Sequence, residues 1–63
     1  MENRIKMLRE CLGLTQKSLS DLSGINIRQI QKYESGEYDI SKIELKNALS
    51  LSRALNVKAE ELI

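Results

Sequence analysis

The stretch SLSDLSGINIRQIQKYESG, residues 18–36, decides the fold, because two short helical patterns meet in it on either side of Gly24. Thr15 is a suitable N-cap for a helix over 16–23, since its hydroxyl can accept a hydrogen bond from a free N–H of the first turn. Glycine at position 24 ends this helix, because glycine adopts a positive φ without steric cost. The first half of the stretch therefore predicts a helix of about two turns.

A second helix follows after a turn of three residues. Asn26 is a suitable N-cap for it, and Gln29 can reach back to the backbone N–H of Asn26 as in a capping box. Gly36 ends this helix. Two short helices joined by a three-residue turn that contains glycine form a helix-turn-helix arrangement.

The sizes of the residues around the turn agree with this arrangement. Ser20 and Ser23 are small, as the contact point of two steeply crossing helices requires. The positions that point into a shared core are apolar, namely Leu19, Ile25, Ile30 and Tyr33. Each feature is common on its own, but their combination is fairly specific.

The rest of the chain also reads as short helices. Apolar residues at helical spacing predict a first helix over 2–12. The sequence SKIE at 41–44 fits a capping box and predicts that a fourth helix begins near Lys42. Asn56 can adopt a left-handed conformation and end that helix, and a last short helix is expected over 57–63.

The composition favours one all-α domain over residues 1–63, since the chain is too short for two. It has no proline and many Leu, Lys, Glu, Arg and Gln residues, which favour helices. Tyr33 and Tyr38 are the only aromatic residues, so the core must be aliphatic. The side chains expected in the core are Ile5, Leu8, Leu19, Leu22, Ile30, Leu45, Leu51 and Leu55, and Leu62 and Ile63 are expected to turn inward.

Charge, cysteine and histidine content exclude several classes of function. A net charge of +1 gives little non-specific attraction to nucleic acids. The single Cys11 cannot form a disulfide within the chain, which is typical of the reducing cytoplasm, and neither a signal peptide nor a membrane span is expected. Histidine, a Gly-rich phosphate loop and clustered carboxylates are all absent, so we expect no enzyme activity, metal site, cofactor or small-molecule ligand.

Several of these motifs resemble the Cro/repressor-type (XRE-like) helix-turn-helix DNA-binding domains of bacteria and their phages. They are Thr15-Gln16, Ser23-Gly24-Ile25, Ile30, the YESG run at 33–36 and the ALNV run at 54–57. The resemblance extends from about Ile5 to Leu62 and implies a compact, lambda-repressor-like bundle of five short helices. The chain departs from the family in several respects: the connection from Gly36 to Leu45 is about two residues longer and lacks a proline, Ser52 replaces a small apolar residue, and Lys58 stands where Ser or Thr often caps the last helix.

The resemblance implies that the helix around residues 26–35 reads double-stranded DNA. It places four side chains toward the base edges, namely Ile27, Arg28, Gln31 and Lys32. Further side chains are expected at the DNA backbone, namely Thr15, Gln16, Lys17, Asn26, Ser35, Tyr38 and Lys42. Glu34 is expected to have a structural role, such as bonding a loop or holding an arginine. The alternatives are that the row on this helix is only a solvated face and that the Ser, Thr and Gln residues are plain caps.

The function that these expectations favour is a sequence-specific transcriptional regulator, a repressor that binds a palindromic operator as a homodimer. A single domain covers a small DNA interface, and spare apolar side chains at Leu49, Val57 and Ile63 are candidates for the dimer contact. Two alternatives use the same fold, namely an antitoxin and a protein-interaction module. The long hydrogen-bonding side chains of the 26–35 helix favour DNA over the interaction module.

Overall fold

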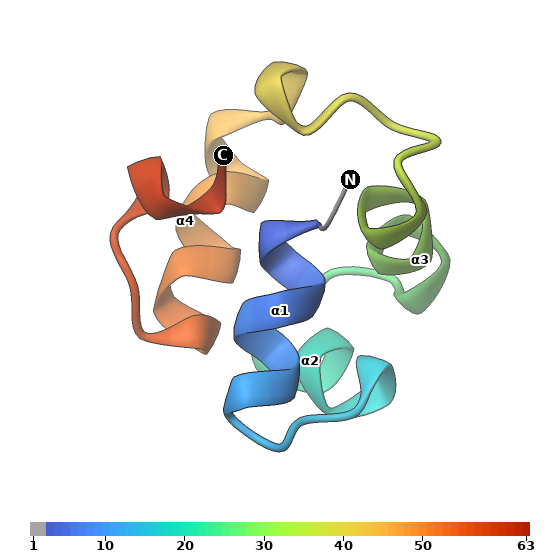
Figure 1. Ribbon diagram of the computed structural model, residues 1–63, viewed down its shortest axis with the longest axis vertical. Coiled ribbons are helices and arrows are strands. Elements are labelled where there is room, and N and C mark those ends of the chain that lie inside the picture. Colours follow the sequence, from blue (N-terminus) through green and yellow to red (C-terminus); the bar gives the residue numbers. More distant parts are fainter. Residues whose placement is uncertain (1–2) are drawn as a thin grey trace.

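The computed structural model describes residues 3–63, and every regular element in this range is helical. There are four α-helices and two short 3₁₀ helices (Figure 1), which are α1 Arg4–Cys11, α2 Gln16–Ser23, α3 Ile27–Ser35, η1 Ile40–Lys42, α4 Leu45–Leu55 and η2 Ala59–Leu62. The all-α class is thus confirmed. The expected fifth α-helix is instead the 3₁₀ helix η2. Residue 2 of the first helix expected over 2–12 lies outside the described residues.

The signals around Gly24 place α2 and α3 correctly. The Thr15 hydroxyl accepts a hydrogen bond from the backbone N–H of Ser18, and Gly24 adopts a φ of 74° directly after the helix. Asn26 Oδ1 accepts from the N–H of Arg28 at 2.8 Å. In the described residues the side chain of Gln29 makes no hydrogen bond to the N–H of Asn26, so the cap is confirmed without the reciprocal half of a capping box.

The prediction that a helix begins near Lys42 is wrong, because Ser41, the residue expected to cap that helix, is hydrogen-bonded to Asp39. The Asp39 carboxylate accepts from both the N–H and the hydroxyl of Ser41, at 3.1 and 2.7 Å. This local cap starts the 3₁₀ helix η1 and leaves no serine for a capping box further along. The long helix α4 consequently begins only at Leu45, after an uncapped Glu44.

The core lies where α2 packs between α3 and α4, with α1 against α3 and η2. Most of the expected core is confirmed: five of the expected side chains are 2% exposed or less, namely Ile5, Leu19, Ile30, Leu51 and Leu55. Leu8 is half-buried and packs against this cluster. Tyr33 adds an aromatic ring at 2% exposure and meets Tyr38 edge to face, with ring centroids 5.3 Å apart.

Two leucines expected in the core are exposed. Leu22 is 62% exposed, because the inward stripe of α2 consists of Leu19 with the half-buried residues Gln16, Ser20 and Ser23. The three-residue spacing of Leu19 and Leu22 instead predicts a neighbouring stripe. Leu45 is 73% exposed because it is the first residue of α4, beyond the turn that packs on the core.

The C-terminal segment folds back onto α4 through η2. Lys58 gives no side-chain cap to this short helix, as its departure from the family pattern suggested. Leu62 is buried as expected, whereas Ile63 is 66% exposed, which corrects the expectation that it turns inward. No helix among residues 3–63 combines the length and the apolar character that a membrane crossing needs.

The cap of η1 makes one pH-dependent prediction. The Ser41 hydroxyl, and next the Ser41 N–H, hold the pKa of Asp39 below its ordinary value of 3.8. Because the pKa is lowered in the folded state, the cap stabilises the fold above pH 3.8, and this stabilisation is lost as the pH falls through the folded-state pKa. An NMR titration of the Asp39 carboxyl carbon should show a midpoint that Ser41→Ala raises and the control Ser50→Ala does not. An unchanged midpoint in Ser41→Ala would contradict this.

Candidate nucleic-acid interface

The turn between α2 and α3 is held by hydroxyl groups of α2. Ser20 Oγ donates to the carbonyl oxygen of Ile25, and Ser23 Oγ accepts from the N–H of Ile25 at 3.2 Å. Both serines are therefore more than small residues at a crossing point, because they satisfy backbone groups of the turn. Ile25 is only 7% exposed, so it anchors the turn in the core. The turn therefore determines where α3 begins relative to the core.

Gly24 is required in this turn for its backbone conformation alone. A Cβ added there would meet no atom within 4 Å, while φ is 74°. We therefore expect Gly24→Ala to lower the free energy of unfolding by about 1–2 kcal/mol through left-handed strain. Gly24→Asn should lose less, since asparagine tolerates this region. Urea denaturation followed by circular dichroism measures both, and equal losses in the two variants would argue against strain as the cause.

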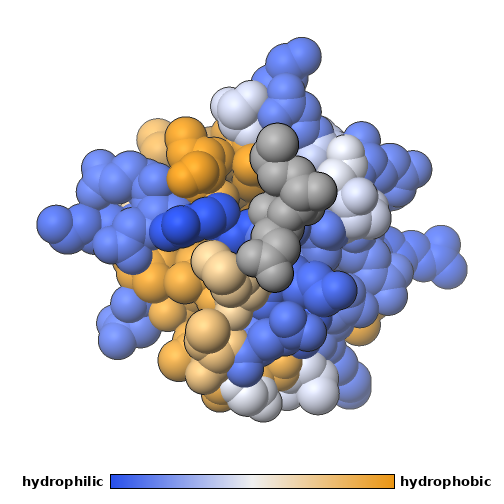
Figure 2. All heavy atoms as spheres, in the orientation of Figure 1, coloured by the Kyte–Doolittle hydropathy of each residue, from blue (hydrophilic) through white to orange (hydrophobic). Residues whose placement is uncertain are grey.

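The outer face of α3 presents the side chains expected at base edges. Arg28, Gln31 and Lys32 are exposed, and Ile27 is half-buried. Arg28, Gln31 and Lys32 point away from the core residues Ile30 and Tyr33, whereas Ile27 lies at the edge of the buried side, three positions before Ile30. Figure 2 shows hydrophilic residues over the side where α3 lies and hydrophobic residues gathered toward α1 and α4. The row is thus free to meet a ligand, and its contact with bases stays a prediction.

Three of the expected backbone-contacting residues lie together at the start of α2. Thr15 and Lys17 are exposed and Gln16 is half-buried. The Thr15 hydroxyl already serves as the N-cap, and Lys17 Nζ lies 3.6 Å from Asp21 in an exposed pair. Such a pair is weak in water, so Lys17 can exchange it for a phosphate. The free N–H groups of this helix start also favour an anion.

The remaining expected backbone contacts surround α3. Asn26 is exposed at its N-cap, and Ser35 is exposed at its last turn, where its hydroxyl accepts from the N–H of Glu37 at 3.2 Å. Tyr38 is half-buried and its hydroxyl donates to the carbonyl oxygen of Lys42 at 3.0 Å. Tyr38 therefore supports the loop between α3 and η1 and carries Lys42 with it.

A buried ion pair joins α1 to α3. Arg9 Nε and Nη2 donate to the two oxygens of Glu34 at 2.8 and 3.0 Å, and the side chains are only 11% and 4% exposed. Arg9 Nη1 also donates to the carbonyl oxygen of Leu14 at 2.7 Å. The hydrogen bond with Glu34 raises the pKa of Arg9, which keeps the guanidinium charged. The expectation that Glu34 holds an arginine is confirmed, and Arg9 is that arginine.

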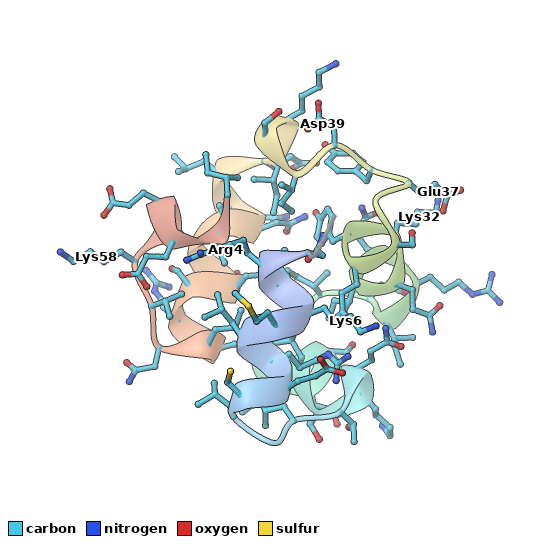
Figure 3. All side chains as sticks on the ribbon, in the orientation of Figure 1. Arg4, Lys6, Lys32, Glu37, Asp39 and Lys58 are labelled. Carbon is cyan, nitrogen blue, oxygen red and sulfur yellow. The ribbon has the colours of Figure 1, made fainter. Side chains whose placement is uncertain are left out.

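The ion pair continues toward the surface through two glutamines. Gln16 Nε2 donates to Glu34 Oε1 at 3.2 Å, and Gln31 Nε2 donates to Gln16 Oε1 at 3.4 Å. These residues, with Lys6 and Ser35, line a cleft of about 310 Å³ between α1, α2 and α3. Figure 3 shows Lys6 extending from α1 toward α3.

Sequence reasoning missed Lys6, because no motif links the first helix to the outer face of α3. Its place beside the cleft cannot be seen in a single sequence, because it results from the packing of α1 against α3. Lys6 is exposed and positively charged beside the expected phosphate contact Gln16. In residues 3–63 no three Cys, Asp or Glu side chains gather closely enough to hold a metal ion.

The residues expected at a dimer contact differ in exposure. Leu49 is 39% exposed and Ile63 is 66% exposed, whereas Val57 is half-buried and packs against the core. Leu45, which precedes Leu49 by one helical turn, adds a further exposed apolar side chain to the same side of α4. Together with the contact between α4 and η2, this leaves apolar surface at the C-terminal half of the chain.

Comparisons with known proteins agree with this geometry. A sequence model of the helix-turn-helix family matches residues 5–62. Uncharacterized HTH-type transcriptional regulators of Sinorhizobium medicae and Rhizobium meliloti are each 40% identical to this chain over 55 residues, or 87% of it. The chain spans only 37% of the length of these relatives.

A solved structure has the same fold. The restriction-modification controller protein C.AhdI from Aeromonas hydrophila superposes with a TM-score of 0.84 at 33% identity. The superposition covers 95% of this chain and 86% of the controller protein. The family match extends over the turn, the outer row of α3 and the Arg9–Glu34 pair. The chain therefore belongs to the helix-turn-helix family of the Cro/repressor, or XRE, type.

Proposed function

We propose that this domain is a transcriptional regulator that binds double-stranded DNA in a sequence-specific manner. Helix α3 enters the major groove, and the start of α2 contacts the phosphate backbone. The observation that carries the proposal is the exposed row Arg28, Gln31 and Lys32 on the outer face of α3. The names of the relatives as transcriptional regulators and of the neighbour as a controller protein support it.

Each side chain of the row suits a different feature of the groove. Arg28 can donate to both acceptors of a guanine, and Ile27 can pack on a thymine methyl. Lys32 carries a charge that reaches a guanine or a phosphate. The residues at the start of α2, with Lys6, then position the domain without specifying sequence.

Selection of bound duplexes from a random pool tests the proposal directly. We expect one recurring sequence, and we expect the chain to bind it at least about 10³-fold more tightly than a scrambled duplex of equal length. The enriched sequence also gives the half-site spacing and symmetry. Recovery of no recurring sequence, with equal binding to all duplexes, would contradict the proposal. Recovery of a stable toxic protein from cell lysate would instead favour the antitoxin alternative.

We further propose that the regulator is a repressor that acts as a homodimer on a palindromic operator. One domain buries only about 600–1,000 Å² on DNA, so a second copy is needed for tight binding. The exposed Leu45, Leu49 and Ile63 supply apolar surface for the contact between copies. A reporter whose promoter overlaps the selected operator tests the direction of regulation, and repression requires that its output falls when the chain is expressed.

The dimer makes a separate prediction at Leu49. We expect Leu49→Lys to leave the fold intact, since this side chain is 39% exposed, and to prevent a second copy from docking because a lysine charge would be buried. Sedimentation with the palindromic duplex should show two chains per duplex for the wild type and one for the variant. The control Leu22→Lys, at an exposed leucine on α2, should still bind as two chains. A wild type that sediments as one chain per duplex would contradict the proposed dimer.

A further inference from the structure

The loop between α3 and η1 is anchored to the core through two tyrosine rings. Tyr33 is 2% exposed, and its carbonyl oxygen and its hydroxyl accept hydrogen bonds from Asn3 Nδ2 at 2.6 Å and from Asn47 Nδ2 at 2.9 Å. The ring of Tyr38 meets this fixed ring edge to face, and the Tyr38 N–H donates to the carbonyl oxygen of Lys32 at 3.2 Å. Tyr38 is therefore held both by its ring and by its backbone.

The hydroxyl groups at this loop already donate to backbone carbonyl oxygens. Tyr38 Oη donates to the carbonyl oxygen of Lys42 at 3.0 Å, and Ser35 Oγ donates to that of Lys32 at 3.2 Å. A hydroxyl has one proton, and a phosphate oxygen only accepts hydrogen bonds, so neither hydroxyl can bond a phosphate while it keeps its present partner. Lys42, in contrast, is exposed, and no ion pair among residues 3–63 includes it.

We propose that Tyr38 is a positioning residue that presents Lys42 to a phosphate of the DNA backbone. Its hydroxyl holds the backbone at the end of η1, and its ring ties that backbone to the core. Because this part of the loop is ordered before DNA binds, less conformational freedom is lost on binding. The inference rests on the proposed function. It replaces the expected direct contact of Tyr38 with the phosphate by an effect through Lys42.

The salt dependence of DNA binding tests this inference. Each phosphate contact contributes about 0.9 to the slope of the logarithm of the binding constant against the logarithm of the salt concentration. We expect Lys42→Met to lower the slope by about 0.9 and to weaken the selected and scrambled duplexes by the same factor. Tyr38→Phe keeps the ring and removes the bond to Lys42. It should also lower the slope and weaken both duplexes by about threefold.

The double variant Tyr38→Phe/Lys42→Met separates positioning from direct contact. If Tyr38 acts through Lys42, the double variant should bind no more weakly than Lys42→Met alone, because effects within one unit are not additive. Fluorescence anisotropy between about 50 and 200 mM salt gives the affinities and the slopes. If Tyr38 itself meets a phosphate, the losses of the two single variants multiply and the inference is overturned.

Ser50→Ala provides the matched control on α4, where no DNA contact is expected. Ser50 Oγ donates to the carbonyl oxygen of Lys46 at 3.0 Å, the same distance as between Tyr38 and Lys42. Loss of this bond should change neither the affinity nor the slope. A Tyr38→Phe variant that loses stability but keeps the slope of the wild type would show that the hydroxyl serves only the fold, and would overturn the inference.

Backbone order in the free chain gives a second measurement that does not depend on affinity. The N–H of Ile43 shares a peptide plane with the carbonyl oxygen of Lys42. Its NMR order parameter should fall in Tyr38→Phe and stay unchanged in Ser50→Ala. An unchanged order parameter in Tyr38→Phe would contradict the positioning.

Failure of the inference is distinct from failure of the proposed function. A wild type that binds all duplexes equally overturns the sequence-specific function, while the slopes of Tyr38→Phe and Lys42→Met still decide the inference. A wild type that binds no duplex overturns both. A wild type that prefers the selected duplex with a slope that does not depend on Lys42 overturns the inference alone.

Discussion

We expect Arg9→Met to lower the free energy of unfolding by about 3–5 kcal/mol, because it leaves the carboxylate of Glu34 buried without its charged partner. The side chain of Glu34 is only 4% exposed, so water cannot replace the guanidinium. The carbonyl oxygen of Leu14 also loses its donor. A domain of this length has only about 3–9 kcal/mol of stability in total. The variant should therefore be largely unfolded near room temperature.

Two controls separate the cost of the orphaned charge from the loss of an ion pair as such. Lys17→Met breaks the exposed pair with Asp21 and should cost less than about 1 kcal/mol. The double variant Arg9→Met/Glu34→Leu removes both charges and should recover most of the stability, since apolar side chains can replace a buried pair. Urea denaturation measures all three. Equal losses in Arg9→Met and Lys17→Met would show that the buried pair contributes no more than a surface pair.

Helix boundaries were predictable from the sequence wherever a single residue determines where the helix begins or ends. Gly24 and Asn56 adopt positive φ values of 74° and 56°, and Thr15 and Asn26 use their own side chains as caps. These are local effects, so one sequence is enough to show them. The start of α4 was not predictable in this way, because two capping patterns overlap and both need Ser41. Asp39 directly precedes η1 and accepts hydrogen bonds from the N–H and the hydroxyl of Ser41, so Ser41 becomes part of η1 and caps no later helix.

Burial was predictable only in helices whose apolar residues fit a single face. A helix as short as α2 contains few apolar residues, so the pair Leu19 and Leu22 suggests one stripe, while packing between α3 and α4 selects another. The selected stripe contains Ser20 and Ser23, whose hydroxyl groups satisfy the turn. Ser20 and Ser23 hydrogen-bond to backbone groups of the turn and occupy the inward positions of α2, so Leu22 stays exposed. Hydropathy alone does not reveal this.

The candidate site also has one part that the sequence predicts and another that only the packing of the helices shows. Exposure of Arg28 and Gln31 follows from the periodicity of α3 and agrees with the sequence expectation. The links from Gln31 to Gln16 and from Glu34 to Arg9 join residues that are 15 and 25 positions apart. Such contacts depend on how the helices pack, so the sequence suggested an arginine partner for Glu34 without identifying which one.

Joint replacement of Arg28 and Gln31 by alanine should remove most of the sequence preference. Each base contact contributes about 1–3 kcal/mol of discrimination, so the two together contribute about 2–6 kcal/mol. We expect the ratio of affinities for the selected and scrambled duplexes to fall by at least about thirtyfold. Both side chains are exposed on α3, and alanine favours helix, so the fold should be kept.

Three measurements decide whether this loss is specific. Circular dichroism and thermal unfolding of Arg28→Ala/Gln31→Ala should match the wild type, while fluorescence anisotropy gives its affinity for both duplexes. Lys17→Met should weaken both duplexes by a similar factor, because phosphate contacts are indifferent to sequence. An intact double variant that still distinguishes the two duplexes as well as the wild type would mean that Arg28 and Gln31 do not read the bases.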